Sequence, residues 1–399
     1  MSVLVEFDVN RARAETPGCS SVLHFDNAGA ALMPEPVLRA AIDHLNREAR
    51  EGGYRAAELA EEAVAHVYEG AARLIGASTD EIAVVENATR AWDMAFYALP
   101  LAKGDRILTG MAEYVSNYVA MRQVARRTGA VVEAIPDDAE GQISVAALRD
   151  AIDERVKLIA LTHVPSSGGL VNPAEEVGRV AKEAEIPYVL DACQSVGQMP
   201  IDVDRIGCDM LVATSRKYLR GPRGMGFLYV RRTMLEQLEP PFLDIHAIQW
   251  EKWISRTQYE VAPTARRFEN WETNYAAKIA MGVAIDYALQ WGLETTWARV
   301  KELGRSLREA LASLPGVTLQ DRGPKQCGIV SFTVENREPT AITDLLARQA
   351  INVTASPGFV TPFDSEARGL TSGVVRASVH YYNSDEEIER FCKTLATLL

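Results

Sequence analysis

Short apolar runs alternate with amphipathic stretches over the middle of the chain. The runs are rich in β-branched residues, as is typical of strands, and lie at 82–87, 105–110, 131–136, 157–164, 186–192, 209–215 and 226–230. The stretches between most of them have helical spacing and lie at 89–99, 116–128, 144–153 and 173–184. This alternation predicts an α/β fold with a mostly parallel sheet covered on both faces. Because no helix is evident between the last two runs, one antiparallel edge strand is expected.

A second, smaller unit with the same alternation of strand-like and helical segments follows. Its strand-like runs lie at 327–334 and 374–382, and its helices are expected near 339–349 and from Asp385 onwards. Two long helices precede it, at 276–291 and 293–313, after an irregular, aromatic-rich stretch at 240–275. The sequence therefore predicts an N-terminal segment (1–20), a large domain (21–275) and a small C-terminal domain with its linking helix (276–399).

Charge and composition narrow the classes of function. The chain has 399 residues and a net charge of −12, from 42 basic and 54 acidic side chains. Because a negative chain is repelled by phosphate backbones and anionic lipid, neither nucleic-acid nor membrane binding is expected. The start lacks the pattern of a signal peptide, and no apolar run approaches the roughly 18 residues of a spanning helix. We therefore expect a cytoplasmic protein.

The cysteines and histidines do not suggest a metal site. The five cysteines are far apart and form no CxxC pair, and the six histidines show no HExxH spacing. Reduced thiols without a structural metal are therefore expected.

Asp191 and Lys217 carry the strongest chemical signal. Asp191 ends the apolar run Tyr188–Leu190, and Lys217 closely follows the next run, so both are expected at the carboxyl edge of the sheet. Ligands bind at that edge in open α/β folds. Pyridoxal 5′-phosphate (PLP) needs both residue types, because a lysine amine forms the Schiff base and a carboxylate keeps the pyridine nitrogen protonated. The sequence therefore predicts a PLP enzyme.

Longer motifs carry a family resemblance. The segments are HFDNAGAA (24–31), THVPSSGGLVNP (162–173), LDACQSVGQMPIDVDRIGCDMLVATSRKYLRGPRGMGFLYV (190–230) and VRASVHYYNSDEE (375–387). Together they resemble the class V aminotransferase superfamily, which includes the cysteine desulfurases. The resemblance implies a fold-type-I PLP enzyme with a seven-stranded large domain. It also implies a homodimer with shared active sites and a small-molecule amino-acid substrate.

The resemblance assigns roles around the cofactor. It makes Lys217 the Schiff-base lysine, pairs Asp191 with the pyridine nitrogen and places Gln194 near the ring 3′-oxygen. It assigns phosphate binding to Ala88, Thr89, Thr214 and Arg216. Free backbone N–H groups at a helix N-terminus, such as those expected at 88–89, favour a phosphate.

Other positions depart from the family pattern. Tyr114 stands where many relatives have a ring-stacking histidine, and Ser166 replaces an asparagine of the desulfurases. Thr273 or Asn274 is expected to replace the threonine that reaches the neighbouring subunit's phosphate. Arg376 matches the arginine that binds a substrate carboxylate. On a strand, Ser378 and His380 would face the same side as Arg376, so His380 is a further candidate for substrate binding.

The reaction expected is β-elimination of a sulfur-linked substituent. The segment 355–373 lacks the cysteine of the desulfurases, so the sequence predicts that the protein is not a persulfide-forming cysteine desulfurase. The segments 52–58, 113–117 and 215–224 resemble PLP-dependent carbon–sulfur lyases, such as hercynylcysteine sulfoxide lyase, and isopenicillin-N-epimerase-like proteins. Transamination and epimerisation, which use the same lysine and aspartate, remain alternatives. A non-catalytic regulatory protein that binds PLP is the alternative of another class.

Overall fold

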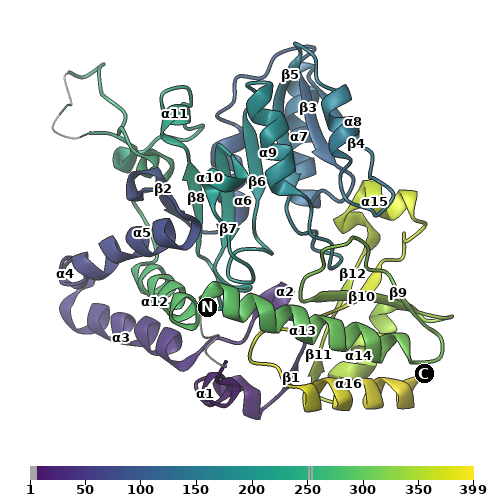
Figure 1. Ribbon diagram of the computed structural model, residues 1–399. Helices are drawn as coiled ribbons and strands as arrows, with labels where there is room; N and C mark the ends of the chain where they lie inside the picture. The colour runs from purple at the N-terminus through teal and green to yellow at the C-terminus, as the bar shows by residue number, and fades with distance from the viewer. Residues whose placement is uncertain (1–6, 250–251, 253–254) are drawn as a thin grey trace, which may run out of the picture.

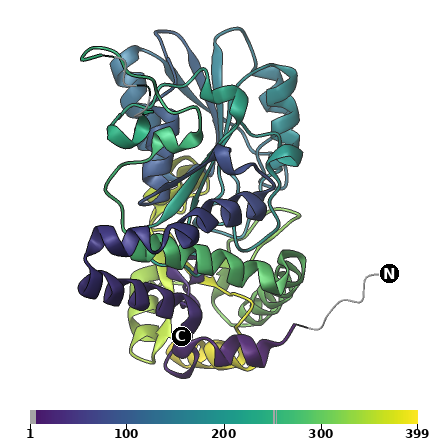
Figure 2. The ribbon, with the colours of Figure 1, turned by 90° about the vertical axis from the view of Figure 1, so that its left-hand side faces the viewer.

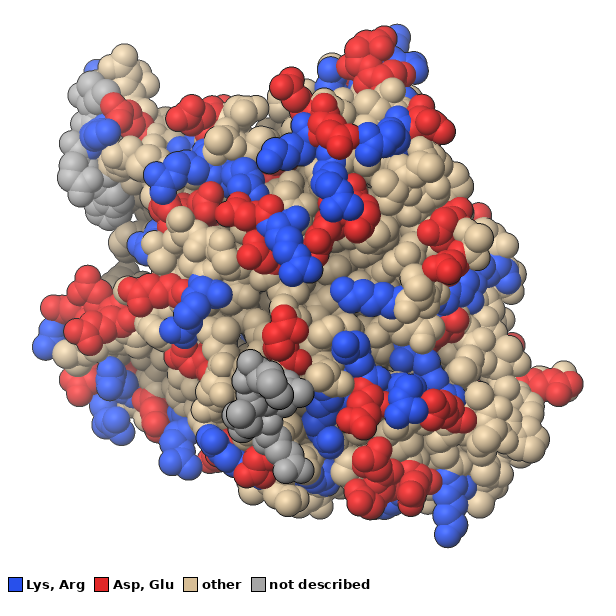
Figure 3. Space-filling view, in the orientation of Figure 1, with Lys and Arg blue, Asp and Glu red and all other residues tan. Residues whose placement is uncertain are grey.

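The computed structural model describes residues 7–249, 252 and 255–399. Residues 1–6 of the predicted N-terminal segment, and Trp250 and Trp253 of the predicted aromatic stretch, lie outside the described residues. Within the described part, no helix is long and apolar enough to cross a membrane. Figure 3 shows basic and acidic side chains interspersed over one face of the molecule.

A seven-stranded sheet forms the centre of the large unit (Figure 1). Its strands are β2 (Ile82–Val85), β3 (Arg106–Gly110), β4 (Val131–Ile135), β5 (Val156–Thr162), β6 (Tyr188–Asp191), β7 (Met210–Thr214) and β8 (Gly226–Val230). Their order is β2-β8-β7-β6-β5-β3-β4, and only the pairs that involve β8 are antiparallel. All seven strands were predicted from apolar runs, and the α/β fold class is confirmed.

The antiparallel strand does not lie where the sequence predicted it. An edge position was expected, but β8 lies inside the sheet, between β7 and β2. The connection between β7 and β8 is too short for a crossover helix, so the chain reverses direction there. The edge position beyond β8 is taken by β2, which comes much earlier in the chain.

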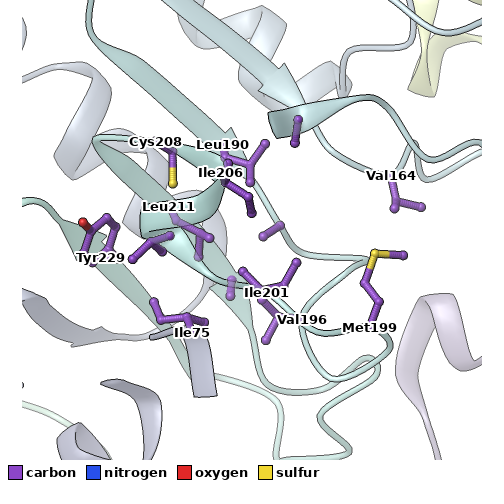
Figure 4. Packing of buried hydrophobic residues seen from close by; sticks show 14 of the residues in the cluster. Ile75, Val164, Leu190, Val196, Met199, Ile201, Ile206, Cys208, Leu211 and Tyr229 are labelled. Carbon is purple, nitrogen blue, oxygen red and sulfur yellow. The ribbon is translucent and has the colours of Figure 1, made fainter. Parts of the chain in front are cut away.

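Helices cover both faces of this sheet. They are α6 (Ala88–Phe96), α7 (Val115–Thr128), α8 (Val145–Asp150), α9 (Ala174–Glu183), α10 (Val203–Ile206) and α11 (Arg232–Leu235). Successive strand residues point to opposite faces. Leu190 and Leu211 therefore pack with Ile206 and Tyr229 on one face (Figure 4). The other face carries a second apolar cluster that includes Trp92 of α6.

The first quarter of the chain is mostly helical. It contains α1 (Val9–Ala14), η1 (Pro17–Ser20), β1 (Leu23–His24), α2 (Asn27–Ala30), α3 (Glu35–Glu51), α4 (Gly53–Glu58), α5 (Glu61–Ile75) and η2 (Thr79–Glu81). Helices α3 and α5 pack against α12 (Tyr275–Trp291), and Figure 2 shows the purple and green helices side by side. The irregular stretch before α12 holds η3 (Ile245–Ala247) and η5 (Ala265–Phe268).

A smaller C-terminal domain completes the chain. Its elements are α13 (Leu293–Ala312), β9 (Val317–Leu319), β10 (Ile329–Val334), α14 (Pro339–Ala347), β11 (Ile351–Asn352), β12 (Thr354–Ser356), η6 (Gly358–Val360), α15 (Pro362–Ala367), β13 (Val374–Ser378) and α16 (Asp385–Leu398). Four of the strands form an antiparallel sheet in the order β12-β13-β10-β9. Strand β11 instead pairs in parallel with β1. The exact domain limits at residues 20 and 275 stay a prediction.

Candidate active site

A cavity of about 430 Å³ opens at the carboxyl edge of the central sheet. The described residues that line it are Asn87, Ala88, Thr89, Tyr114, Asn117, Thr162, Val164, Ser166, Asp191, Cys193, Gln194, Thr214, Arg216, Lys217 and Gly224. Strands β5, β6 and β7 end here side by side. Parallel strands bring their carboxyl ends to one edge, so residues far apart in sequence meet in this cavity.

Asp191 is held by two donors at the end of β6. Its Oδ1 accepts from the backbone N–H of Cys193 at 2.9 Å, and its Oδ2 accepts from Nδ2 of Asn117 at 2.8 Å. The side chain is only 5% exposed. Each carboxylate oxygen keeps a free lone pair, so Asp191 can still accept a hydrogen bond from a protonated ring nitrogen.

Asn117 is a site residue that the sequence analysis missed. It lies on the first turn of α7, three residues after Tyr114, and is 3% exposed. Residues three apart on a helix share a face, so Tyr114 pointing into the cavity brings Asn117 with it. That spacing in EYVSN was the signal that could have found it.

Lys217 lies in the tight turn that follows β7. The N–H of Arg220 donates to the Lys217 carbonyl at 2.9 Å, and the N–H of Gly221 donates to the Ser215 carbonyl at 2.8 Å. Burial lowers the pKa of Lys217 to about 8, and the nearby guanidinium of Arg216 acts in the same direction. A substantial fraction of this amine is therefore neutral, and hence nucleophilic, near physiological pH.

Cys193 is the thiol that faces this cavity. Burial raises its pKa well above the ordinary value, and the carboxylate of Asp191 adds to the rise. The residue is thus held as a thiol rather than a thiolate. It lines the cavity together with Asp191 and Gln194.

The other end of the cavity suits an anion. Helix α6 begins there, capped by Asn87, whose side chain accepts from the Arg90 N–H at 2.9 Å. The N–H groups of Ala88 and Thr89 belong to the first turn, which has no intrahelical acceptor for them. Arg216 and Thr214 line the same cavity as this helix terminus. Arg216 is oriented by a 2.5 Å hydrogen bond from its Nη1 to the Gly29 carbonyl.

Arg376 lies just behind the cavity lining. It donates from Nη1 to the Ser166 carbonyl at 2.8 Å and from Nη2 to Oδ1 of Asp26 at 2.9 Å. Its Nε, like the Oγ of Ser166, is buried with no hydrogen-bond partner among the described residues. A substrate carboxylate near Ser166 would satisfy both atoms.

The structure does not bring His380 into the cavity lining. The prediction assumed a strand through residue 382, but β13 ends at Ser378. Beyond it the chain turns, and the Asn383 side chain accepts from the His380 N–H at 2.8 Å. The His380 ring is fully buried, with Nε2 2.9 Å from the Tyr218 carbonyl oxygen. Ser378 instead supports α2, because its Oγ accepts from the Ala28 N–H at 2.9 Å.

Thr273 and Asn274 also lie away from the cavity lining of their own chain. Asn274 is the N-cap of α12, and its side chain accepts from the Ala277 N–H at 2.9 Å. The expected contact of either residue with a second subunit's cofactor stays a prediction.

The cavity fits PLP. It offers a carboxylate for the ring nitrogen, a lysine amine for the aldehyde and a helix N-terminus with an arginine for the phosphate. The Oε1 atom of Gln194 is buried with no partner in the described part of the chain, while its Nε2 donates to the Ala28 carbonyl at 3.1 Å. A buried amide that lacks a partner usually has one supplied by a ligand or water. Among the described residues, no group of three or more His, Cys, Asp or Glu could hold a metal.

Comparisons with known proteins agree with this geometry. The Aminotransferase class-V family model matches residues 23–391. A probable cysteine desulfurase of Pyrococcus abyssi is 29% identical over 97% of this chain and 96% of its own length. One from Xylella fastidiosa is 32% identical over 94% of this chain and 90% of its own length.

Solved structures show the same fold. The apo structure of a cysteine desulfurase from Thermococcus onnurineus NA1 has a TM-score of 0.91 and 27% identity, covering 100% of this chain and 99% of its own. The cystine C–S lyase C-DES, solved with its product cysteine persulfide, has a TM-score of 0.86 over 96% of this chain and 99% of its own. Its identity is 23%, so it supports the fold alone.

One sequence prediction is wrong. The cysteine-free segment 355–373 was read as excluding a persulfide-forming cysteine desulfurase. Both relatives, which match nearly the whole chain, are named probable cysteine desulfurases, and the structure from Thermococcus onnurineus is named a cysteine desulfurase. The absence of one residue from one segment was too local an observation to exclude that activity.

Proposed function

Because this chain belongs to the class V aminotransferase family of PLP-dependent enzymes, we propose that it breaks the carbon–sulfur bond of a cysteine-class α-amino acid. The observation that carries the proposal is the shared cavity of Lys217 and Asp191, in a chain whose full-length relatives are named for sulfur release from cysteine. The segments that resemble carbon–sulfur lyases also support the carbon–sulfur bond as the bond that is broken.

Bound PLP supplies an electron sink for the pair of electrons left when the substrate Cα loses its proton. The residues of this chain bind, orient and move protons around it. Lys217 takes the Cα proton, which its lowered pKa favours, because its free amine is then available near neutral pH. Asp191 holds the proton on the ring nitrogen. Arg216 and the first turn of α6 bind the phosphate, and Arg376 binds the substrate carboxylate near Ser166.

Two product routes are open to this bond cleavage. In β-elimination the Cα proton and the β-sulfur substituent leave together as one thiol, and water converts the remaining aminoacrylate into pyruvate and ammonia. In desulfuration an acceptor thiol takes the sulfur as a persulfide, and the remainder leaves as alanine. The lyase-like segments favour the first route, and the names of the relatives favour the second.

Product analysis tests the proposal and separates the routes. The PLP-loaded enzyme is incubated with cysteine, cystine and cysteine S-conjugates, with and without dithiothreitol as thiol acceptor. We expect sulfide or thiol together with either pyruvate or alanine, quantified by mass spectrometry. Conversion of the cofactor to pyridoxamine phosphate without sulfur release would instead indicate transamination and overturn the proposal.

We also propose that two copies associate with shared active sites. The support is the family resemblance, together with the position of Thr273 and Asn274 outside their own cavity. Light scattering gives the mass in solution. Mixing a Lys217→Ala copy with a copy altered at Thr273 and Asn274 tests sharing, because one intact site would then form at the interface and restore activity.

A further inference from the structure

Glu113 is a buried carboxylate that the proposed reaction does not use. It immediately precedes Tyr114, at the entrance to α7, and its side chain is fully buried. Burial raises the pKa of Glu113, hydrogen bonds from Thr162, Asn117 and Thr109 oppose the rise, and the negative charge of Asp191 adds to it. A buried charge of this kind is costly unless its oxygens are well supplied with donors.

Four neutral donors surround Glu113. Its Oε1 accepts from the Thr162 hydroxyl at 2.6 Å, from Nδ2 of Asn117 at 2.8 Å and from the Tyr114 N–H at 3.0 Å. Its Oε2 accepts from the Thr109 hydroxyl at 2.7 Å. An ionised carboxylate is an acceptor at both oxygens, so four donors fit the charged form.

The amide of Asn117 joins this carboxylate to the cofactor site. Its one nitrogen donates both to Oε1 of Glu113 and to Oδ2 of Asp191, each at 2.8 Å. Both hydrogens of the amide nitrogen are therefore used in these two hydrogen bonds, and only one orientation of the Asn117 side chain allows both. All three side chains are at most 5% exposed, so water screens this chain of hydrogen bonds very little.

We propose that Glu113 is a positioning residue, which acts through Asn117 to fix the Asp191 carboxylate and to place a second negative charge behind it. The added negative potential would favour a proton on the ring nitrogen of a PLP molecule held by Asp191. The two carboxylates thus act on the ring as one unit joined by an amide. This inference rests on PLP binding and is independent of whether the substrate carries sulfur.

A purely structural role for Glu113 makes a different prediction. Thr109 lies on β3 and Thr162 on β5, so Glu113 also ties two strands to α7. If Glu113 is only structural, losing these hydrogen bonds lowers the stability of the protein. It does not change the relative affinity for PLP and for an analogue that lacks the ring nitrogen. The test therefore needs a ligand that differs from PLP at the ring nitrogen alone.

Binding of PLP and of 1-deazapyridoxal phosphate, which has carbon in place of the ring nitrogen, provides this test. Dissociation constants are measured by fluorescence titration of the cofactor-free protein. The wild type is expected to prefer PLP. In Glu113→Gln, which keeps the shape and removes the charge, PLP binding is expected to weaken about 5- to 10-fold while deaza-cofactor binding barely changes.

Two further variants complete the test. Asn117→Ser removes the bridging amide and is expected to reduce the preference in the same direction, which keeps the proposal testable if Glu113→Gln fails to fold. Glu269→Gln is the control for loss of a buried carboxylate away from the cavity, because Glu269 is also 2% exposed but bonds to Tyr68, the Val84 N–H and Lys278. This control variant should have a lower free energy of unfolding and should keep the wild-type preference for PLP over the deaza-cofactor. An unchanged preference in both Glu113→Gln and Asn117→Ser would overturn the proposal.

Discussion

Lys217 concentrates the proposed chemistry in one amine. Replacing it with alanine removes the base but leaves the phosphate and ring contacts of the cavity. We expect Lys217→Ala to lose turnover by about 10³-fold or more, while PLP still binds non-covalently. Sulfide or thiol release measures turnover, and gel filtration followed by absorbance measures retained cofactor. The exposed Lys182→Ala on α9 is the control, and full activity in Lys217→Ala would contradict the assignment.

The lowered pKa of Lys217 predicts how cofactor attachment depends on pH. Only the neutral amine reacts with the aldehyde of PLP, and burial lowers its pKa from 10.5 to about 8. The attachment rate to cofactor-free protein should therefore rise roughly tenfold per pH unit below about pH 8 and level off above it. Stopped-flow absorbance follows the reaction. If the rate instead kept rising up to the pH at which an ordinary lysine loses its proton, the amine would not be buried as described.

Site residues were predictable where a short motif placed them at a strand end. Lys217, Asp191 and Gln194 line one cavity as expected from their position after apolar runs. Asn117 was missed because its role depends on a contact between α7 and β6, which no local pattern records. His380 was misplaced because the apolar texture continues past the point where the strand ends.

The close approach of β8 to the start of α6 depends on Gly226. A Cβ atom there would lie 2.5 Å from the Ala213 carbonyl oxygen and 3.2 Å from the backbone nitrogen of Ala88. The phosphate end of the cavity begins at that nitrogen. A side chain at this position would therefore push the helix terminus away from the strand.

Gly226→Ala is expected to lower stability by about 1–3 kcal/mol and to weaken PLP binding. Thermal unfolding and a PLP titration measure the two effects. Gly53→Ala, at the exposed start of α4 where a Cβ faces open space, is the control and should change neither property appreciably. Wild-type cofactor affinity in Gly226→Ala would show that the strand does not set the helix position.

Elements of the large sheet were predictable because each strand is apolar along its length. Their pairing was not, because hydrogen-bond partners are distant in sequence. Strand β8 was expected at an edge and is internal, since β2 pairs with it across about 140 residues of chain. The two-residue strands β1 and β11 carry no periodicity of their own, and they pair because the fold brings them together.

At the scale of the whole molecule, Arg220 joins three distant parts of the chain. Its Nη2 donates to the Thr16 hydroxyl at 2.5 Å, its Nε to the Leu32 carbonyl at 2.8 Å and its Nη1 to the Tyr381 hydroxyl at 2.9 Å. The guanidinium also lies 4.4 Å from the centre of the Tyr382 ring. Its backbone has a φ of +61°, a left-handed conformation that the surrounding contacts must hold in place.

Arg220→Lys keeps the charge but loses the planar fork. A single ammonium does not reproduce three divergent hydrogen bonds, so buried acceptors are left unpaired. We expect a loss of about 3 kcal/mol in the free energy of unfolding, measured by urea denaturation. Arg223→Lys, on the exposed part of the same loop, is the control. An unchanged urea midpoint in Arg220→Lys would contradict the role given to this residue.

The position of Arg220, three residues after Lys217, links the cofactor site to a much later part of the chain. Tyr381 is synthesised 161 residues after Arg220, and until its hydroxyl arrives the turn that presents the lysine lacks one of its anchors. A nascent or truncated polypeptide should therefore stay pale in the presence of vitamin B6 phosphate. The appearance of yellow colour would then mark the moment at which Tyr381 has reached the turn that holds Lys217.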